Sequence, residues 1–197
     1  MADHRRPESE AEPADRVARL TVAVTERDHA QGPGDASVTL VEYGDFECPH
    51  CGRAHPVIQE IQRRLGEQLR FVFRHFPLGE MHRHAQHAAE ASEAASSQGH
   101  FWEMHDALFE HQQALGDRQL AEYAGQIGID ESRLQRELID HVHASRVRQD
   151  FMSGIRSGVN GTPTFFINGV RHDDPWDLDT LLAVLTAAAG GRPRTDA

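Results

Sequence analysis

The stretch between residues 38 and 74 limits the possible fold more than any other part of the chain. Residues 38–43 are β-formers with a nearly continuous apolar character, as in a strand that is buried on both faces. Apolar side chains then recur with helical spacing over residues 57–65, and residues 69–74 alternate like a second strand. A strand, a helix and a strand in this order predict an α/β fold.

The two cysteines of the chain, Cys48 and Cys51, lie where the first strand gives way to the helix. Residues three apart on a first helical turn face the same side, so their sulfurs can form a disulfide with little backbone movement. The unpaired N–H groups and partial positive charge of a helix N-terminus stabilise a thiolate. Pro49 presets the helical φ angle, and a protonated His50 would add positive charge near Cys48. The sequence therefore predicts a redox-active dithiol.

Three acidic residues precede this dithiol. Asp45 and Glu47 are close to Cys48 in sequence, and their negative charges should raise the pKa of its thiol. Glu42 lies within the buried strand, where a carboxylate is costly and needs a reason. Two interpretations of Glu42 stay open, namely a desolvated acid with a functional role and an edge-strand acid that reaches solvent.

The rest of the chain predicts a helical block followed by a return to strands. Apolar stripes over residues 80–159 have helical spacing and are typical of core packing. Residues 164–167 and the residues from 170 onward flank Asn168-Gly169, the preferred pair for a two-residue hairpin turn. Asp177 can cap a final helix.

These elements predict one domain. Residues 18–189 are expected to form an α/β domain of the order βαβ…ββα with a mixed central sheet, and residues 80–159 an inserted helical subdomain. Residues 27–36 contain Gly-Pro-Gly-Asp and predict a loop. The polar segments 1–17 and 190–197 predict disorder.

Composition narrows the function classes. The formal net charge of −11 argues against nucleic acid as a partner, because phosphate binding needs clustered Lys and Arg. No stretch approaches the roughly 18 apolar residues of a membrane span. Residues 1–15 lack the apolar core of a signal peptide, so a cytoplasmic location is expected. Stable structural disulfides are rare there, which favours a redox-active or metal-binding role for a paired CxxC.

Zinc is the main alternative use of the two cysteines. Tetrahedral structural zinc requires four ligands, and the chain has no second CxxC. His82, His84 and His87 could complete such a site, but their surroundings indicate an exposed helix or loop. His55, beyond the dithiol on the predicted helix, is likewise expected at the surface. We therefore expect no metal.

Several motifs together resemble a known family. Cys48-Pro49-His50-Cys51, the later Pro56, and Gly161-Thr162-Pro163-Thr164-Phe165 before the hairpin resemble the thioredoxin fold. They are most similar to its DsbA-like branch, which carries a helical insertion between the βαβ and ββα halves. The resemblance covers residues 38–188.

The resemblance implies a role for each site residue. Cys48 would be the nucleophile and Cys51 the buried resolving thiol, with Glu42 as an acid that helps move the proton of Cys51. Pro163 would be a cis-proline that packs against the dithiol and leaves the preceding backbone free to pair with substrate. Thr162 would face the sulfur pair.

The expected activity is thiol–disulfide exchange with protein or low-molecular-weight substrates, without a cofactor besides the Cys48–Cys51 disulfide. The redox partner stays unidentified, and so does the direction. Cys-Pro-His-Cys resembles oxidising members of the family, whereas a cytoplasmic location favours a reductase. Two alternatives stay open, namely a non-catalytic chaperone or binding module on the same fold, and an enzyme of the glutathione-transferase or isomerase branch.

Overall fold

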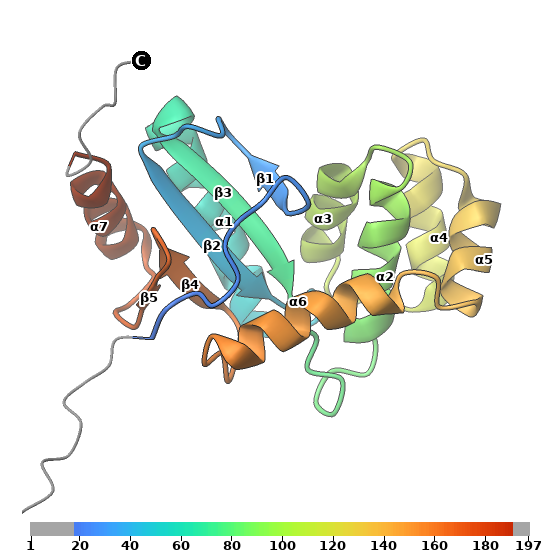
Figure 1. Cartoon of the computed structure of the whole chain (residues 1–197). Helices are drawn as coiled ribbons and strands as arrows, with labels where there is room; N and C mark the ends of the chain where they lie inside the picture. Colours follow the sequence, from blue (N-terminus) through green and yellow to red (C-terminus); the bar gives the residue numbers. More distant parts are fainter. Residues whose placement is uncertain (1–17, 191–197) are drawn as a thin grey trace, which may run out of the picture.

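The structure is a computed structural model that describes residues 18–190, and it confirms an α/β domain with an inserted helical block (Figure 1). The predictions for residues 1–17 and 191–197 lie outside this range, while Gly190 belongs to the last helix instead of the predicted tail. The elements in chain order are β1 (His29–Gln31), β2 (Val38–Gly44), α1 (Pro49–Leu65), a 3-10 turn (Gly66–Gln68), β3 (Leu69–His75), α2 (Ala85–Ser96), α3 (Phe101–Glu110), α4 (Asp117–Gln126), α5 (Glu131–Ile139), α6 (Ala144–Arg156), β4 (Thr164–Ile167), β5 (Val170–His172) and α7 (Leu178–Gly190).

The strands form one five-stranded mixed sheet in the order β1-β3-β2-β4-β5. The central strands β2 and β3 are parallel, and every other neighbouring pair is antiparallel. The β4–β5 hairpin turns at Asn168 and Gly169, which both have positive φ angles of 49° and 79°, as the preferred two-residue turn requires. The predicted hairpin is therefore confirmed.

Alternation along β2 divides the core between the two faces of the sheet. Val38 and Leu40 belong to the larger cluster, which includes buried residues of α1 and α7. Val41 and Tyr43 belong to a smaller cluster on the other face, against which Phe151 of α6 packs. Glu42 has the same parity as Leu40, so it points towards the face that α1 covers.

The helical insertion lies at one end of the sheet (Figure 1). Helix α2 packs against α3, α4, α5 and α6, and α6 returns the chain to the sheet along the face opposite α1. None of the helices between residues 18 and 190 has the length and apolar character needed to cross a membrane.

The predicted loop over residues 27–36 is partly wrong, because it contains the edge strand β1. Its three residues, His-Ala-Gln, have no periodicity that could predict a strand, and only pairing with β3 defines it. The preceding segment is held by the buried Arg74, which donates to Asp28 at 2.7 Å and to the carbonyls of Val22 and Ala23 at 3.0 and 3.1 Å.

Candidate functional site

The dithiol lies at the start of α1, as predicted. Cys48 is the N-cap of the helix with extended backbone angles (φ −71°, ψ 121°), and Pro49 is the first helical residue. The carbonyl of Cys48 accepts the first helical hydrogen bond, from the N–H of Gly52 at 3.1 Å. Cys51 is fully buried one turn later, and Cys48 is only 4% exposed. Both cysteines are free thiols.

The environment of Cys48 favours its thiolate. Its pKa is lowered to about 4, chiefly because the Cys51 side chain hydrogen-bonds its sulfur. Burial opposes this shift, while a hydrogen bond with Thr162 and the backbone N–H groups of Cys51 and His50 add to it. The first turn of α1 therefore stabilises the negative charge with the amide groups that a helix N-terminus leaves unpaired.

The environments of Cys51 and Glu42 favour the protonated forms of these two side chains. Burial raises the pKa of Cys51 well above its usual value, and the hydrogen bond to Cys48 and the charge of Glu42 raise it further. Glu42 is 3% exposed, and burial together with the Cys48 charge raises its pKa to about 8. Glu42 is therefore a desolvated acid under α1, and the interpretation that its side chain reaches solvent is wrong.

Thr162 and Pro163 lie across from the dithiol, as the resemblance implies. The Cys48 sulfur lies 3.4 Å from the Thr162 carbonyl oxygen, and the Thr162–Pro163 peptide bond is cis. The Thr162 hydroxyl is buried and has no other hydrogen-bond partner, so its proton is available to the Cys48 thiolate.

The ring of His50 forms a hydrogen bond with Arg53. Its Nδ1 lies 2.8 Å from a guanidinium nitrogen of Arg53, so this ring nitrogen accepts a hydrogen bond. It is the backbone N–H of His50 that contributes to the low pKa of Cys48. Pro49 and His50 are both exposed at the helix start.

Asp45 and Glu47 anchor a loop instead of facing the dithiol. Asp45 accepts hydrogen bonds from the N–H of Leu78 at 2.9 Å and pairs with His82 at 2.7 Å. Glu47 accepts from the N–H of His84 at 2.6 Å and pairs with its ring at 2.8 Å. Neither carboxylate is among the main causes that set the pKa of Cys48.

Gln112, just after α3, is a site residue that the sequence analysis missed. Its side-chain N–H₂ donates to the carbonyls of Phe46 and Cys48 at 2.7 and 2.9 Å. The same amide contacts the position that a Cβ at Gly52 would occupy, so Gly52 lets it approach the first turn of α1. No periodicity or motif marks Gln112 in the sequence.

The histidines weighed as zinc ligands do not converge. His82, His84 and His87 pair with Asp45, Glu47 and Asp117, respectively. His55 is not at the surface as expected, since it is 8% exposed and stacks on Phe109 at a centroid distance of 5.0 Å.

Comparisons with known proteins agree with this geometry. A family model described as thioredoxin matches residues 24–187. The structure of BdbD from Bacillus subtilis is similar with a TM-score of 0.76 and 25% identity, covering 82% of this chain and 92% of that chain. Alpha-DsbA1 from Wolbachia pipientis has a TM-score of 0.73 and 21% identity over 85% and 93% of the two chains. The expected DsbA-like thioredoxin fold is confirmed.

Segments of curated proteins that are named as Na(+)/H(+) antiporters also match this chain. Na(+)/H(+) antiporter NhaA 1 from Salinispora arenicola (strain CNS-205) is 47% identical over 174 residues, which are 87% of this chain and 26% of that protein. Na(+)/H(+) antiporter NhaA from Herminiimonas arsenicoxydans is 42% identical over 84% of this chain and 26% of its own length. This chain spans about a quarter of the length of these relatives, so the likeness concerns one segment of each.

Proposed function

The chain belongs to the thioredoxin family, and on this basis we propose that it is a thiol–disulfide oxidoreductase whose working group is the Cys48–Cys51 pair. The observation that carries the proposal is the opposed acidity of the two thiols. The pKa of Cys48 is lowered to about 4, and that of Cys51 is raised well above its usual value. At neutral pH such a pair offers one thiolate to substrate and keeps the other sulfur protonated until it is needed.

In the disulfide-donating direction, a substrate thiolate attacks the Cys48 sulfur of the Cys48–Cys51 disulfide. The S–S bond breaks, and Cys51 leaves with the electron pair and takes up a proton, which the Glu42 carboxyl with its pKa of about 8 can supply. A second substrate thiolate then attacks the substrate sulfur of the mixed disulfide, and Cys48 leaves as a thiolate. Two electrons thereby pass from the substrate to the protein dithiol.

We propose that this donating direction is the favoured one. At pH 7, ionisation of a thiol with a pKa of about 4 is favourable by about 4 kcal/mol. That stabilisation belongs to the reduced protein alone, and for a two-electron couple it corresponds to about 90 mV. The stabilised thiolate therefore makes the disulfide form more oxidising. It is also a good leaving group, which speeds the step in which Cys48 departs.

The reduction potential of the Cys48–Cys51 couple, measured against glutathione buffers, tests the proposal. We expect a potential well above that of the cytosolic glutathione pool, together with oxidation of a reduced dithiol peptide that Cys48→Ala abolishes. A couple that does not interconvert at any glutathione ratio would contradict the exchange function. If a variant without both cysteines still suppresses aggregation of another protein, the chaperone alternative would be supported. If such a variant conjugates glutathione, the transferase alternative would be supported.

A second proposal concerns the partner and rests on the antiporter-named relatives. Segments of those proteins are up to 47% identical to this chain. We propose that this domain exchanges disulfides with a Na(+)/H(+) antiporter of that type. In Cys51→Ala, the Cys48 thiolate can still attack a disulfide of the co-expressed antiporter and release one of its sulfurs as a thiolate. Cys51 is then absent and cannot resolve the mixed disulfide, so the antiporter should be trapped covalently. Recovery of no such adduct, with an adduct to a model disulfide-bonded peptide as the positive control, would exclude this partner.

A further inference from the structure

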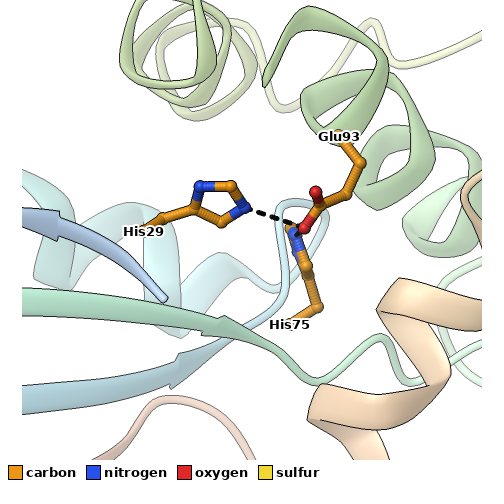
Figure 2. Close-up of side chains that lie close together, drawn as sticks. All are labelled: His29, His75 and Glu93. Carbon is orange, nitrogen blue, oxygen red and sulfur yellow. Dashed lines mark hydrogen bonds and ion pairs between the residues drawn. The ribbon is translucent and has the colours of Figure 1, made fainter. Parts of the chain in front are cut away.

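A polar cluster outside the dithiol site joins the sheet to the helical insertion (Figure 2). It consists of His29 in β1, His75 at the end of β3 and Glu93 in α2. The Nε2 atoms of both histidines lie 2.9 Å from the same oxygen, Oε1 of Glu93. The three possible ligand atoms all lie within 4.8 Å of one another. The proposed exchange reaction uses none of these residues.

Aromatic packing holds both rings in this orientation. The His29 ring is stacked on Phe101 with a centroid distance of 3.5 Å and an interplanar angle of 6°. His75 is 1% exposed and lies edge-on to Phe73 at 5.5 Å and tilted to Phe46 at 5.9 Å. Its Nδ1 has no hydrogen-bond partner, so packing and the Nε2 contact with Glu93 orient the ring. The two nitrogens are therefore directed at Glu93 before any ligand arrives.

The cluster has access to solvent through a cavity of about 690 Å³. His29 and Glu93 line this cavity, which continues along α6 past Arg146 and Asp150. His75 is more deeply buried than either of them. An ion that enters from the cavity would thus meet three protein ligands and keep water on its open side.

We propose that His29, His75 and Glu93 bind a divalent transition-metal ion of the class of Zn²⁺. Imidazole nitrogen and carboxylate oxygen are donors that zinc accepts, and two His with one Glu is a ligand set of open zinc sites. Tetrahedral zinc with bonds of about 2.0–2.2 Å keeps its ligand atoms about 3.3 Å apart, so the present contacts would open by a few tenths of an ångström. The metal replaces both Nε2–H hydrogen bonds, and each ring then carries its proton on Nδ1.

The charges around the cluster are mixed. Arg146 approaches Glu93 Oε1 to 3.7 Å, but its guanidinium also pairs with Asp150. Arg74 is paired with Asp28 at 2.7 Å. Each arginine thus has an acid nearer than Glu93, but an ion would compete with Arg146 for the Glu93 charge and would face Arg27, Arg148 and Arg156 in the cavity. Mg²⁺ and Ca²⁺ prefer oxygen ligands throughout, so the two imidazoles disfavour them.

A bound ion would cross-link three elements that are distant in sequence. His29 and His75 belong to the sheet, and Glu93 belongs to the insertion. Because the unfolded chain does not bring these ligands together, binding should stabilise the folded state. We therefore expect Zn²⁺ to raise the melting temperature.

Equilibrium dialysis of Zn²⁺ against the disulfide form tests the site, because oxidised cysteines cannot ligate the metal. We expect one tight site per chain. Glu93→Gln keeps the side-chain shape but removes the charged ligand, so it should weaken binding by more than the roughly 10–100-fold typical of losing an outer-shell partner. His87→Gln is the matched control, because His87 pairs with Asp117 in an exposed position and should leave the affinity unchanged.

Equal affinity in the wild-type protein and Glu93→Gln would overturn the site, as would the absence of zinc from the oxidised wild-type protein. Should Glu93→Gln fail to fold, His29→Gln at the less buried ligand provides the same comparison. The Zn²⁺-dependent rise in melting temperature of the wild-type protein, absent in the variant, is a second readout. Neither measurement needs a thiol substrate, so the result is independent of the exchange function.

Discussion

Replacing Cys51 with alanine tests the physical origin of the Cys48 acidity. The hydrogen bond from Cys51 is the largest cause of the low pKa of Cys48, which is about 4. A hydrogen bond to a charged group contributes about 1.5–3 kcal/mol, which corresponds to about 1–2 pH units. We therefore expect the pKa of Cys48 to rise to about 5–6 in Cys51→Ala.

The pKa should not return to the value of a free thiol, because other stabilising groups remain. The backbone N–H groups of residues 50 and 51 and the contact with Thr162 are unaffected by the substitution. Cys51→Ser is the matched control, since its hydroxyl can still donate to the Cys48 sulfur in the same buried space. Its Cys48 should therefore stay close to the wild-type value.

The assay is the pH dependence of alkylation of Cys48 by iodoacetamide, supported by the ultraviolet absorbance of the thiolate. A Cys51→Ala variant with the wild-type pKa would refute the reasoning and assign the acidity to the helix N-terminus. A rise of equal size in Cys51→Ser and Cys51→Ala would also refute it, because packing instead of the lost hydrogen bond would then be the cause.

Three further predictions concern stability. Glu42 has a pKa of about 8 in the folded protein, so between pH 4.5 and 8 this residue is ionised in the unfolded chain only, and the free energy of unfolding falls as pH rises. In the reduced protein, Glu42→Gln should therefore raise the free energy of unfolding by about 4 kcal/mol at pH 8, as measured by urea unfolding. A difference between variant and wild type that does not change with pH would contradict this. Gly154→Ala places a Cβ 2.7 Å from the Phe76 ring and should lower the free energy of unfolding by about 1–3 kcal/mol, although alanine has the better helix propensity. A stabilised variant would show instead that the ring moves aside. Arg74→Met leaves Asp28 buried without its partner and should lower the free energy of unfolding by about 3–5 kcal/mol. The double variant with Asp28→Asn should lose less stability than Arg74→Met alone. Equal losses in the two variants would argue against an ion-pair origin.

Much of the fold follows from local patterns in the sequence. The strand, helix and strand before residue 75 and the hairpin at Asn168-Gly169 were predicted from periodicity and turn chemistry. The helical block was predicted because its apolar stripes repeat within each helix. β1 was missed because three residues at a sheet edge carry no periodic signal.

Side-chain surroundings were harder to predict. His55 was expected at the surface, but α3 covers it, and Gln112 reaches the first turn of α1 from a segment with no motif. Asp45 and Glu47 were expected to repel the Cys48 thiolate, yet histidines of the loop before α2 pair with both. Such partners lie dozens of residues away, and no local pattern specifies them.

The sequence by itself determined that two cysteines lie one turn apart at a strand–helix junction, because that placement depends only on neighbouring residues. The tertiary structure decided their chemistry. Cys48 is acidic and Cys51 is not, because one sulfur lies among hydrogen-bond donors and the other is desolvated above Glu42. Likewise, only folding brings His29 and His75 to Glu93. Electrostatic and hydrogen-bond energies depend on distance in space, and the chain fixes that distance only when it packs.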